Sequence, residues 1–200
     1  MFLTRLTLDL RQSAVRRDLA DAYDMHRSLV RAFVTEGDEA PPRFLWRVEP
    51  EAVWRAPVLM VQSIVEPDWR GFKEKGYLKK APETKEIDPA RLIQIERYYR
   101  FRLFANPTIT QQGKRYGLQT EPQQQAWLER KGTKCGFEIQ NVLVTASDVV
   151  HLKNDTICLQ QACFEGVLKA TDAPALQAAV EQGIGPGKAF GLGLLSLAPR

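Results

Sequence analysis

The sequence predicts an α+β protein built from two successive units of the order β-α-β-β-α-β. A strand in which apolar and polar residues alternate opens each half, at Phe2–Leu8 and at Tyr98–Ala105, and a helical segment follows each strand. The chain has 200 residues, which suits two domains of about 100 residues, close to the preferred domain size.

The first half opens with the order β-α-β-β. After the strand at Phe2–Leu8, apolar residues recur with helical spacing over Asp21–Phe33, and the aspartate at its start is a suitable N-cap. Runs of β-branched and aromatic residues predict strands at Phe44–Glu49 and Val58–Val65. The stretch Glu66–Pro89 is rich in proline and lysine, and we expect it to be mostly irregular.

The second half repeats the pattern after its first strand. A turn is predicted at residues 111–115 and a short strand at Tyr116–Gln119. A helix is expected from an N-cap at Thr120, through Pro122 in its first turn, to about Lys131, with Gly132 ending it. The remaining predicted elements are strands at Phe137–Val144 and Cys158–Lys169, a helix at Ala173–Gln182 and a last strand at Leu194–Leu197.

Two tandem ferredoxin-like (RRM-like, βαββαβ) domains are the fold that this element order implies. The boundary is placed in the proline-rich and charged region near residue 90. The predicted domains are therefore residues 1–90, which carry the helix at 21–33, and residues 91–200, which carry a glycine-rich loop.

The charge is mildly basic but clustered. The sequence has 28 Lys and Arg against 24 Asp and Glu, a net charge of +4 and a pI of about 9.0. Arg100 and Arg102 alternate with Tyr99 and Phe101 on the predicted strand, so that one face would carry cations in a row. Clusters of this kind permit nucleic-acid binding. The others are at residues 16–17, 73–80, 114–115 and 130–134.

The cysteine pattern and the lack of a long apolar segment disfavour several classes of protein. Cys135, Cys158 and Cys163 are odd in number and lack a C-x-x-C pair, which disfavours a disulfide framework and a zinc site and predicts reduced, buried thiols. No signal peptide and no run of about 18 apolar residues is found. We expect a cytoplasmic protein with no membrane partner and no metal or cofactor.

A glycine-rich segment near the C-terminus is the most informative motif. Five glycines fall within eleven residues, and glycine allows a positive φ and a close approach of phosphate to backbone N–H groups. The segment lacks the Lys-Ser/Thr ending of a P-loop, which disfavours a nucleoside triphosphatase. It predicts either an anion cradle or a tight turn that needs glycine for its shape. The residues concerned are Gly183, Gly185, Gly187, Gly191 and Gly193, with Lys188 among them.

The helix at residues 21–33 carries the candidate catalytic residues. Met25, Leu29 and Phe33 share one face by their spacing and are expected to be buried, whereas Tyr23 and His26 project side by side from an adjoining stripe. An imidazole can give or take a proton near neutral pH, and a phenol beside it can share that work. Attack on a phosphodiester by its own 2′-hydroxyl requires this chemistry. His26 could equally be an ordinary half-buried residue, and His151 is expected to face solvent.

Several segments together resemble the CasE family, the CRISPR-associated endoribonucleases of the type I-E Cascade complex. The resemblance spans essentially the whole chain, and its C-terminal motif is the signature of a wider superfamily of repeat-associated RNA-binding proteins. The segments are Met1–Leu6, Tyr23–Arg27, Phe101–Pro107, Gln125–Arg130, Cys163–Leu168 and Gly183–Pro199.

The resemblance implies a metal-independent nuclease whose partners are RNA and the other Cascade subunits. Such an enzyme binds the repeat hairpin of precursor CRISPR RNA, cuts at its 3′ base to leave 2′,3′-cyclic phosphate and 5′-hydroxyl ends, and stays bound to the mature guide RNA. His26 would be the principal catalytic residue and Tyr23 its partner. Arg27 would be a phosphate clamp, and Lys114 and Arg115 match a basic turn of the family.

Two other functions remain open from the sequence. One is a non-catalytic RNA-binding subunit of a ribonucleoprotein, in which His26 is incidental. The other is a metabolic enzyme that binds a small phosphate compound. Residues 132–161 match the family least, and some members place a basic hairpin of this region in the RNA groove; the cations noted here are Lys134 and Lys153.

Overall fold

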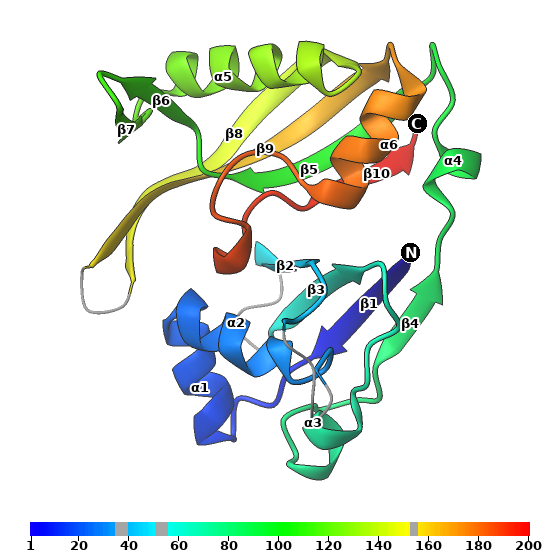
Figure 1. Cartoon of the computed structure of the whole chain (residues 1–200), viewed down its shortest axis with the longest axis vertical. Coiled ribbons are helices and arrows are strands. Elements are labelled where there is room, and N and C mark those ends of the chain that lie inside the picture. The colour runs from blue at the N-terminus through cyan, green and yellow to red at the C-terminus, as the bar shows by residue number, and fades with distance from the viewer. Residues whose placement is uncertain (35–39, 51–55, 153–155) are drawn as a thin grey trace. The chain divides into compact units, whose positions relative to one another are not determined.

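The computed structural model describes residues 1–34, 40–50, 56–152 and 156–200 (Figure 1). Contacts divide it into two compact units. The first consists of Met1–Ile87 together with Ala189–Gly191, and the second of Asp88–Lys188 together with Leu192–Arg200. The assignment of two domains that meet at residue 90 stays a prediction. Among the described residues, every helix is too short or too polar to span a lipid bilayer.

The first unit has a four-stranded antiparallel sheet in the order β2-β3-β1-β4. This order places the first strand of the unit between its third and fourth strands, as the ferredoxin-like fold requires. Its elements are β1 (Phe2–Thr7), α1 (Ser13–Ala20), α2 (Ala22–Val30), β2 (Phe44–Val48), β3 (Val58–Ser63), α3 (Arg70–Glu74) and β4 (Glu83–Glu86).

The core of this unit lies between its helices and one face of the sheet. Met25 and Leu29 of α2 are fully buried against Leu6 of β1 and against Phe44 and Trp46 of β2. The helical spacing therefore predicted the buried face of α2 correctly. Phe33 is buried too, although it lies in a turn beyond the end of the helix at Val30.

The stretch Glu66–Pro89 is mostly irregular, as predicted, but it also contains α3 and β4, which were not predicted, and neither was α1. The sequence of β4, Glu-Thr-Lys-Glu, is wholly exposed and has no apolar alternation. Pairing with β1 holds it in the sheet: the hydroxyls of Thr4 and Thr84 are 3.0 Å apart, and Arg5 donates to Glu83 at 2.9 Å. Such a strand is recognisable only from its partner.

The second unit repeats the topology with the sheet order β10-β5-β9-β8. Its strands are also antiparallel, and a hairpin of two further strands is inserted before the first long helix. Both units thus confirm the predicted tandem ferredoxin-like fold. The elements are α4 (Pro89–Leu92), β5 (Tyr98–Ala105), β6 (Thr108–Gln111), β7 (Lys114–Gly117), α5 (Glu121–Lys134), β8 (Phe137–Leu152), β9 (Ile157–Ala170), α6 (Ala173–Gln182), the 3-10 helix η2 (Lys188–Phe190) and β10 (Leu195–Pro199).

The predicted end of α5 was wrong. The helix continues through Gly132 to Lys134, and Gly136, with φ +75°, follows its C-cap. A Cβ on Gly132 would lie 2.7 Å from the carbonyl oxygen of Phe137, so glycine is required there for packing and not for termination. Thr120 occupies the N-cap position as predicted, but its side chain makes no capping hydrogen bond.

The strand β8 is longer than predicted and includes His151, which is exposed and paired with Cys158 of β9. The prediction of exposure for His151 is confirmed. The expectation of buried thiols holds for Cys163 alone, because Cys158 is exposed and Cys135 is half-buried.

Candidate active site and RNA-binding surfaces

The helix α2 presents the candidate catalytic side chains. Asp21 caps it as predicted, with its carboxylate accepting a hydrogen bond of 2.8 Å from the backbone N–H of Tyr23. Because Met25 and Leu29 anchor one face of the helix in the core, Tyr23 and His26 fall on an adjoining face, where both are partly exposed. The cap and the buried face together fix the position of His26.

The imidazole of His26 is held by aromatic packing. Its ring stacks on Phe44 of β2, with the centroids 5.1 Å apart and an interplanar angle of 20°, and Phe44 in turn stacks on Phe33 at 4.6 Å. The ring nitrogen Nδ1 is buried and has no hydrogen-bond partner among the described residues. One side of the imidazole is therefore fixed in an apolar setting.

Burial lowers the pKa of His26 from its ordinary value of 6.5. Desolvation disfavours the charged form, and a protonated ring would place an N–H at the unpartnered Nδ1 position. The imidazole is accordingly neutral near pH 7 in the free protein. An approaching phosphate would favour its protonation, because a nearby negative charge stabilises the cation.

Tyr23 and Arg27 lie side by side one turn apart on the same helix. The guanidinium carbon of Arg27 is 6.0 Å from the centroid of the Tyr23 ring, at the limit of a cation–π contact. Arg27 also forms an ion pair of 3.6 Å with Asp24, and its side chain remains 65% exposed. An exposed pair of this kind is weak, so Arg27 is able to exchange its carboxylate partner for a phosphate.

The glycine-rich segment needs glycine for its backbone. All five glycines have a positive φ, between 76° and 94°. A Cβ on Gly185 would lie 3.1 Å from the Trp127 ring, and one on Gly191 would lie 2.9 Å from the Trp46 ring. These contacts support the alternative in which the segment is a tight turn shaped by its glycines.

Several backbone amides of this segment are already engaged. The N–H of Gly183 donates to the carbonyl of Ala179 at 2.9 Å, and the N–H of Ile184 donates to the carbonyl of Gly193 at 2.9 Å. Gly193 also donates to Phe104. Amides with these partners are not available to a phosphate, and an anion cradle would have to use others together with the half-buried Lys188.

Lys114 and Arg115 lie on β7, on the exposed hairpin formed by β6 and β7. The turn of this hairpin is formed by Gln112 and Gly113, whose φ values of 49° and 76° suit a two-residue turn. The two cations are thus in a strand and not in the predicted turn at 111–115. Tyr116 beside them is 49% exposed.

The predicted row of cations on β5 is only partly realised. Arg100 is exposed, but Arg102 donates to Glu165 of β9 at 2.7 Å, which neutralises its charge. Tyr99 and Phe101 are buried, so they are core residues and are not exposed for base stacking.

The structure brings Tyr23, His26 and Arg27 together on α2 in the first unit, whereas Lys114 and Arg115 belong to the second unit. The sequence did not indicate the role of Phe44, because a strand residue 18 positions away gives no periodic signal with the helix. Within the described residues, no group of three or more His, Cys, Asp or Glu side chains is arranged to hold a metal ion.

Comparison with known proteins gives a match over nearly the full length. The model of the family described as CRISPR associated protein matches residues 1–199. The chain is 39% identical, over an alignment of 215 residues that covers all of both proteins, to the CRISPR-associated endoribonuclease Cse3 of Thermus thermophilus. It is 33% identical to the CRISPR system Cascade subunit CasE of Escherichia coli, over 90% of this chain and 92% of that protein.

A solved structure shows the same fold with RNA bound. The Thermus thermophilus Cse3 structure with an RNA representing a pre-cleavage complex superimposes with a TM-score of 0.88 and 37% sequence identity. The match covers 99% of this chain and 98% of that one.

Proposed function

This chain belongs to the CRISPR-associated protein family that includes Cse3 and CasE, and we therefore propose that it is an endoribonuclease acting on precursor CRISPR RNA. The observation that carries the proposal is the full-length match to a relative named as an endoribonuclease, whose structure holds RNA before cleavage. The resemblance that the sequence motifs suggested is thereby confirmed as family membership.

The proposed reaction is attack by a ribose 2′-hydroxyl on the adjacent phosphodiester at the 3′ base of the repeat hairpin. The bond between the 2′-oxygen and phosphorus forms while the bond between phosphorus and the 5′-oxygen breaks. The 2′-hydroxyl gives up a proton and the departing 5′-oxygen gains one, so the products are a 2′,3′-cyclic phosphate and a 5′-hydroxyl. The step uses no metal and no protein nucleophile.

His26 is the group we assign to proton transfer at the departing 5′-oxygen. Since Nδ1 is buried, Nε2 is the nitrogen that would meet the RNA. The stack on Phe44 supports this role, because it fixes the ring in one orientation. Tyr23, on the same face, would position or deprotonate the 2′-hydroxyl, and Arg27 would bind the scissile phosphate.

The remaining predicted contacts complete the proposal. Lys114 and Arg115 would bind the RNA backbone from the β6–β7 hairpin, since both are exposed there. The glycine-rich segment and Lys188 would form a further contact with the RNA. As CasE is named a Cascade subunit, we also propose that this protein keeps its product and joins the other Cascade subunits in the cytoplasm. The residue ranges 1–90 and 91–200 are the domains we propose.

A non-catalytic RNA-binding subunit is the alternative, and one experiment separates the two. The purified protein is incubated in EDTA with a repeat-hairpin RNA, and with the same RNA carrying one 2′-deoxy sugar at the scissile nucleotide. We expect cutting of the all-ribose strand alone, with a cyclic phosphate at the new 3′ end. Binding without cutting would favour the non-catalytic subunit, and cutting of the deoxy strand would exclude attack by the 2′-hydroxyl.

A further inference from the structure

A pocket of about 350 Å³ opens in the first unit between α1, α2 and α3, and neither the family match nor the proposed cleavage site accounts for it. Ser28 and Arg31 line it from α2 and the segment after it. Ser28 follows His26 by two residues, which is a rotation of about 200° around a helix, so the pocket lies on the opposite side of α2 from the imidazole. It is a separate site.

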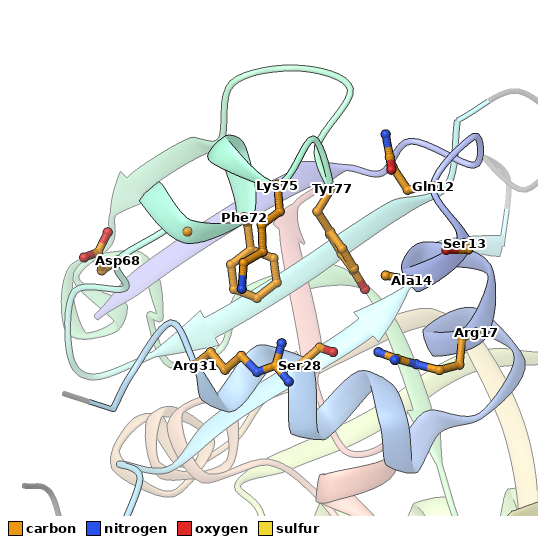
Figure 2. A pocket seen from close by; sticks show the side chains of 11 residues that line it. Gln12, Ser13, Ala14, Arg17, Ser28, Arg31, Asp68, Phe72, Lys75 and Tyr77 are labelled. Carbon is orange, nitrogen blue, oxygen red and sulfur yellow. The ribbon is translucent and has the colours of Figure 1, made fainter. Parts of the chain in front are cut away.

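Three cationic side chains surround this pocket. Figure 2 shows the guanidinium groups of Arg17 and Arg31 extending toward each other across it, while Lys75 and Tyr77 reach in from the side of α3. The hydroxyl of the buried Ser28 also lines the pocket. Cations that converge on a concave surface raise the local concentration of anions.

The carboxylates nearby cancel only part of this charge. Arg17 pairs with the buried Asp18 at 2.6 Å, and Asp18 also accepts a hydrogen bond of 2.8 Å from the Tyr77 hydroxyl. Asp68 at the rim pairs with Arg70 at 2.6 Å.

Arg31 and Lys75 have no carboxylate partner among the residues described, so about two positive charges are left over. Arg31 follows the end of α2 and Lys75 the end of α3, where a cation is favourable in any helix. That preference explains neither the pocket nor the convergence of both side chains on it.

We propose that this pocket binds a phosphate group, with Arg31 and Lys75 as the charged ligands and Ser28 as a hydroxyl donor. A free nucleotide carries a phosphomonoester with about two negative charges at neutral pH, and a nucleotide within RNA is flanked by two phosphodiesters of one charge each, so both match the uncompensated charge. The pocket volume is roughly ten times that of one water molecule, and Phe72 forms an apolar wall, so the ligand would be an organic phosphate such as a nucleotide. Its source is either a nucleotide of the RNA outside the hairpin or a free nucleotide.

The test compares two pairs of charge removals in the full-length protein. Arg31→Gln/Lys75→Gln empties the pocket of its unpaired cations. Lys73→Gln/Lys80→Gln removes the same charge from exposed positions of the same unit that do not line the pocket. Circular dichroism melting checks that both variants are folded.

A third variant narrows the pocket without changing its charge. Gly71 of α3 lines the pocket, and a Cβ there would meet no atom within 4 Å, so the structure has room for a side chain and we expect Gly71→Leu to narrow the pocket. This variant keeps the proposal testable even if the charge removals alter the fold.

The probes distinguish the two sources of phosphate. Adenosine monophosphate is titrated by calorimetry, and affinity is measured for a repeat hairpin with and without single-stranded extensions, each made uncleavable by a 2′-deoxy sugar. We expect the pocket variants to bind either the nucleotide or the extended RNA at least tenfold more weakly than the control variant, with the bare hairpin bound equally. Weaker binding of the extended RNA identifies RNA as the source, and weaker binding of the nucleotide identifies a free ligand.

Equal affinities of the pocket variants and the control variant for every probe would overturn the proposal. The nucleotide titration does not depend on the proposed nuclease activity, and cleavage of the bare hairpin by the pocket variants is measured separately. Failure of one proposal is therefore distinguishable from failure of the other.

Discussion

His26 combines two properties that a surface histidine lacks. Its ring is stacked on Phe44, and its Nδ1 is buried without a partner among the described residues, which lowers the pKa of the imidazole. The ring is thus fixed in position, and it is neutral until a negative charge approaches. Both properties suit a residue that gains and loses a proton only when substrate is bound.

Replacing His26 with alanine should separate catalysis from binding. We expect His26→Ala to lower the single-turnover cleavage rate by about 10²- to 10⁴-fold, the range typical of a missing acid or base, while hairpin affinity changes less than about twofold. His151→Ala is the matched control, since His151 is the other of the two histidines and lies exposed on β8. Unchanged cleavage by His26→Ala would remove this residue from the mechanism.

The pKa of His26 is measurable directly, because only two histidine signals appear in an NMR titration. We expect the value to lie below 6.5 in the free protein and to rise when uncleavable hairpin RNA binds, since burial disfavours the cation and phosphate favours it. A value at or above 6.5 without RNA would contradict the desolvation that burial implies.

The lowered pKa of His26 also predicts the direction in which the stability of the protein changes with pH. The unfolded chain binds a proton at His26 more readily than the folded chain, so the contribution of this residue to stability falls as pH drops below about 6.5. His26→Gln should therefore show a smaller loss of stability between pH 8 and pH 5.5 than the wild type does, as measured by urea unfolding. An identical loss in both proteins would exclude His26 as the source of the difference.

The glycine-rich segment requires glycine for two reasons, which are its backbone conformation and its packing. Gly191 has a φ of 78° and faces Trp46 of the first unit at 2.9 Å from a would-be Cβ. Gly113, in the turn between β6 and β7, has a similar φ of 76° but no atom within 4 Å of such a Cβ. Comparing substitutions at these two positions therefore separates the free-energy cost of the backbone conformation from that of the contact with Trp46.

Alanine at these two glycines should destabilise the protein to different degrees. We expect Gly113→Ala to cost about 1 to 2 kcal/mol through its positive φ alone. Gly191→Ala should cost a further 1 to 3 kcal/mol or so, because the added methyl group overpacks against Trp46. Chemical denaturation of both variants measures the difference. Equal costs would show that Trp46 moves aside, and that only the backbone requires glycine at residue 191.

The exposed cations of the whole molecule together determine how RNA binding depends on salt, because each phosphate that a cation binds adds to this dependence. Lys114 and Arg115 are exposed on their hairpin, whereas Arg102 is already paired with Glu165. Since the net charge is only +4, we expect such local clusters to supply most of the attraction for RNA.

Salt titration should show how many phosphates these cations bind. The affinity for hairpin RNA should fall steeply as salt rises, and Lys114→Gln/Arg115→Gln should reduce the slope of log K against log salt by about two, or about one for each phosphate that is no longer bound. Arg102→Gln is the control and should leave the slope nearly unchanged. A slope that is the same in the first variant and the wild type would remove the hairpin from the RNA interface.

Much of the fold follows from local patterns. Alternation over Tyr98–Ala105 gave the bounds of β5, and helical spacing gave the buried face of α2 together with its cap at Asp21. These elements are predictable because their signal lies within a few successive residues. The motifs along the chain also indicated the family. The candidate residues Tyr23, His26 and Arg27 were found because they lie within about one turn of a single predicted helix.

The features that join residues far apart in the sequence depend on long-range packing and could not be predicted from local patterns. The strand β4 exists through its pairing with β1, and the depressed pKa of His26 follows from burial of its ring, which stacks on a strand residue 18 positions away. The pocket likewise collects Arg31 and Lys75 from separate helices. The physical reason is that periodicity determines which side of an element is buried, whereas long-range packing alone determines which atoms each side chain meets.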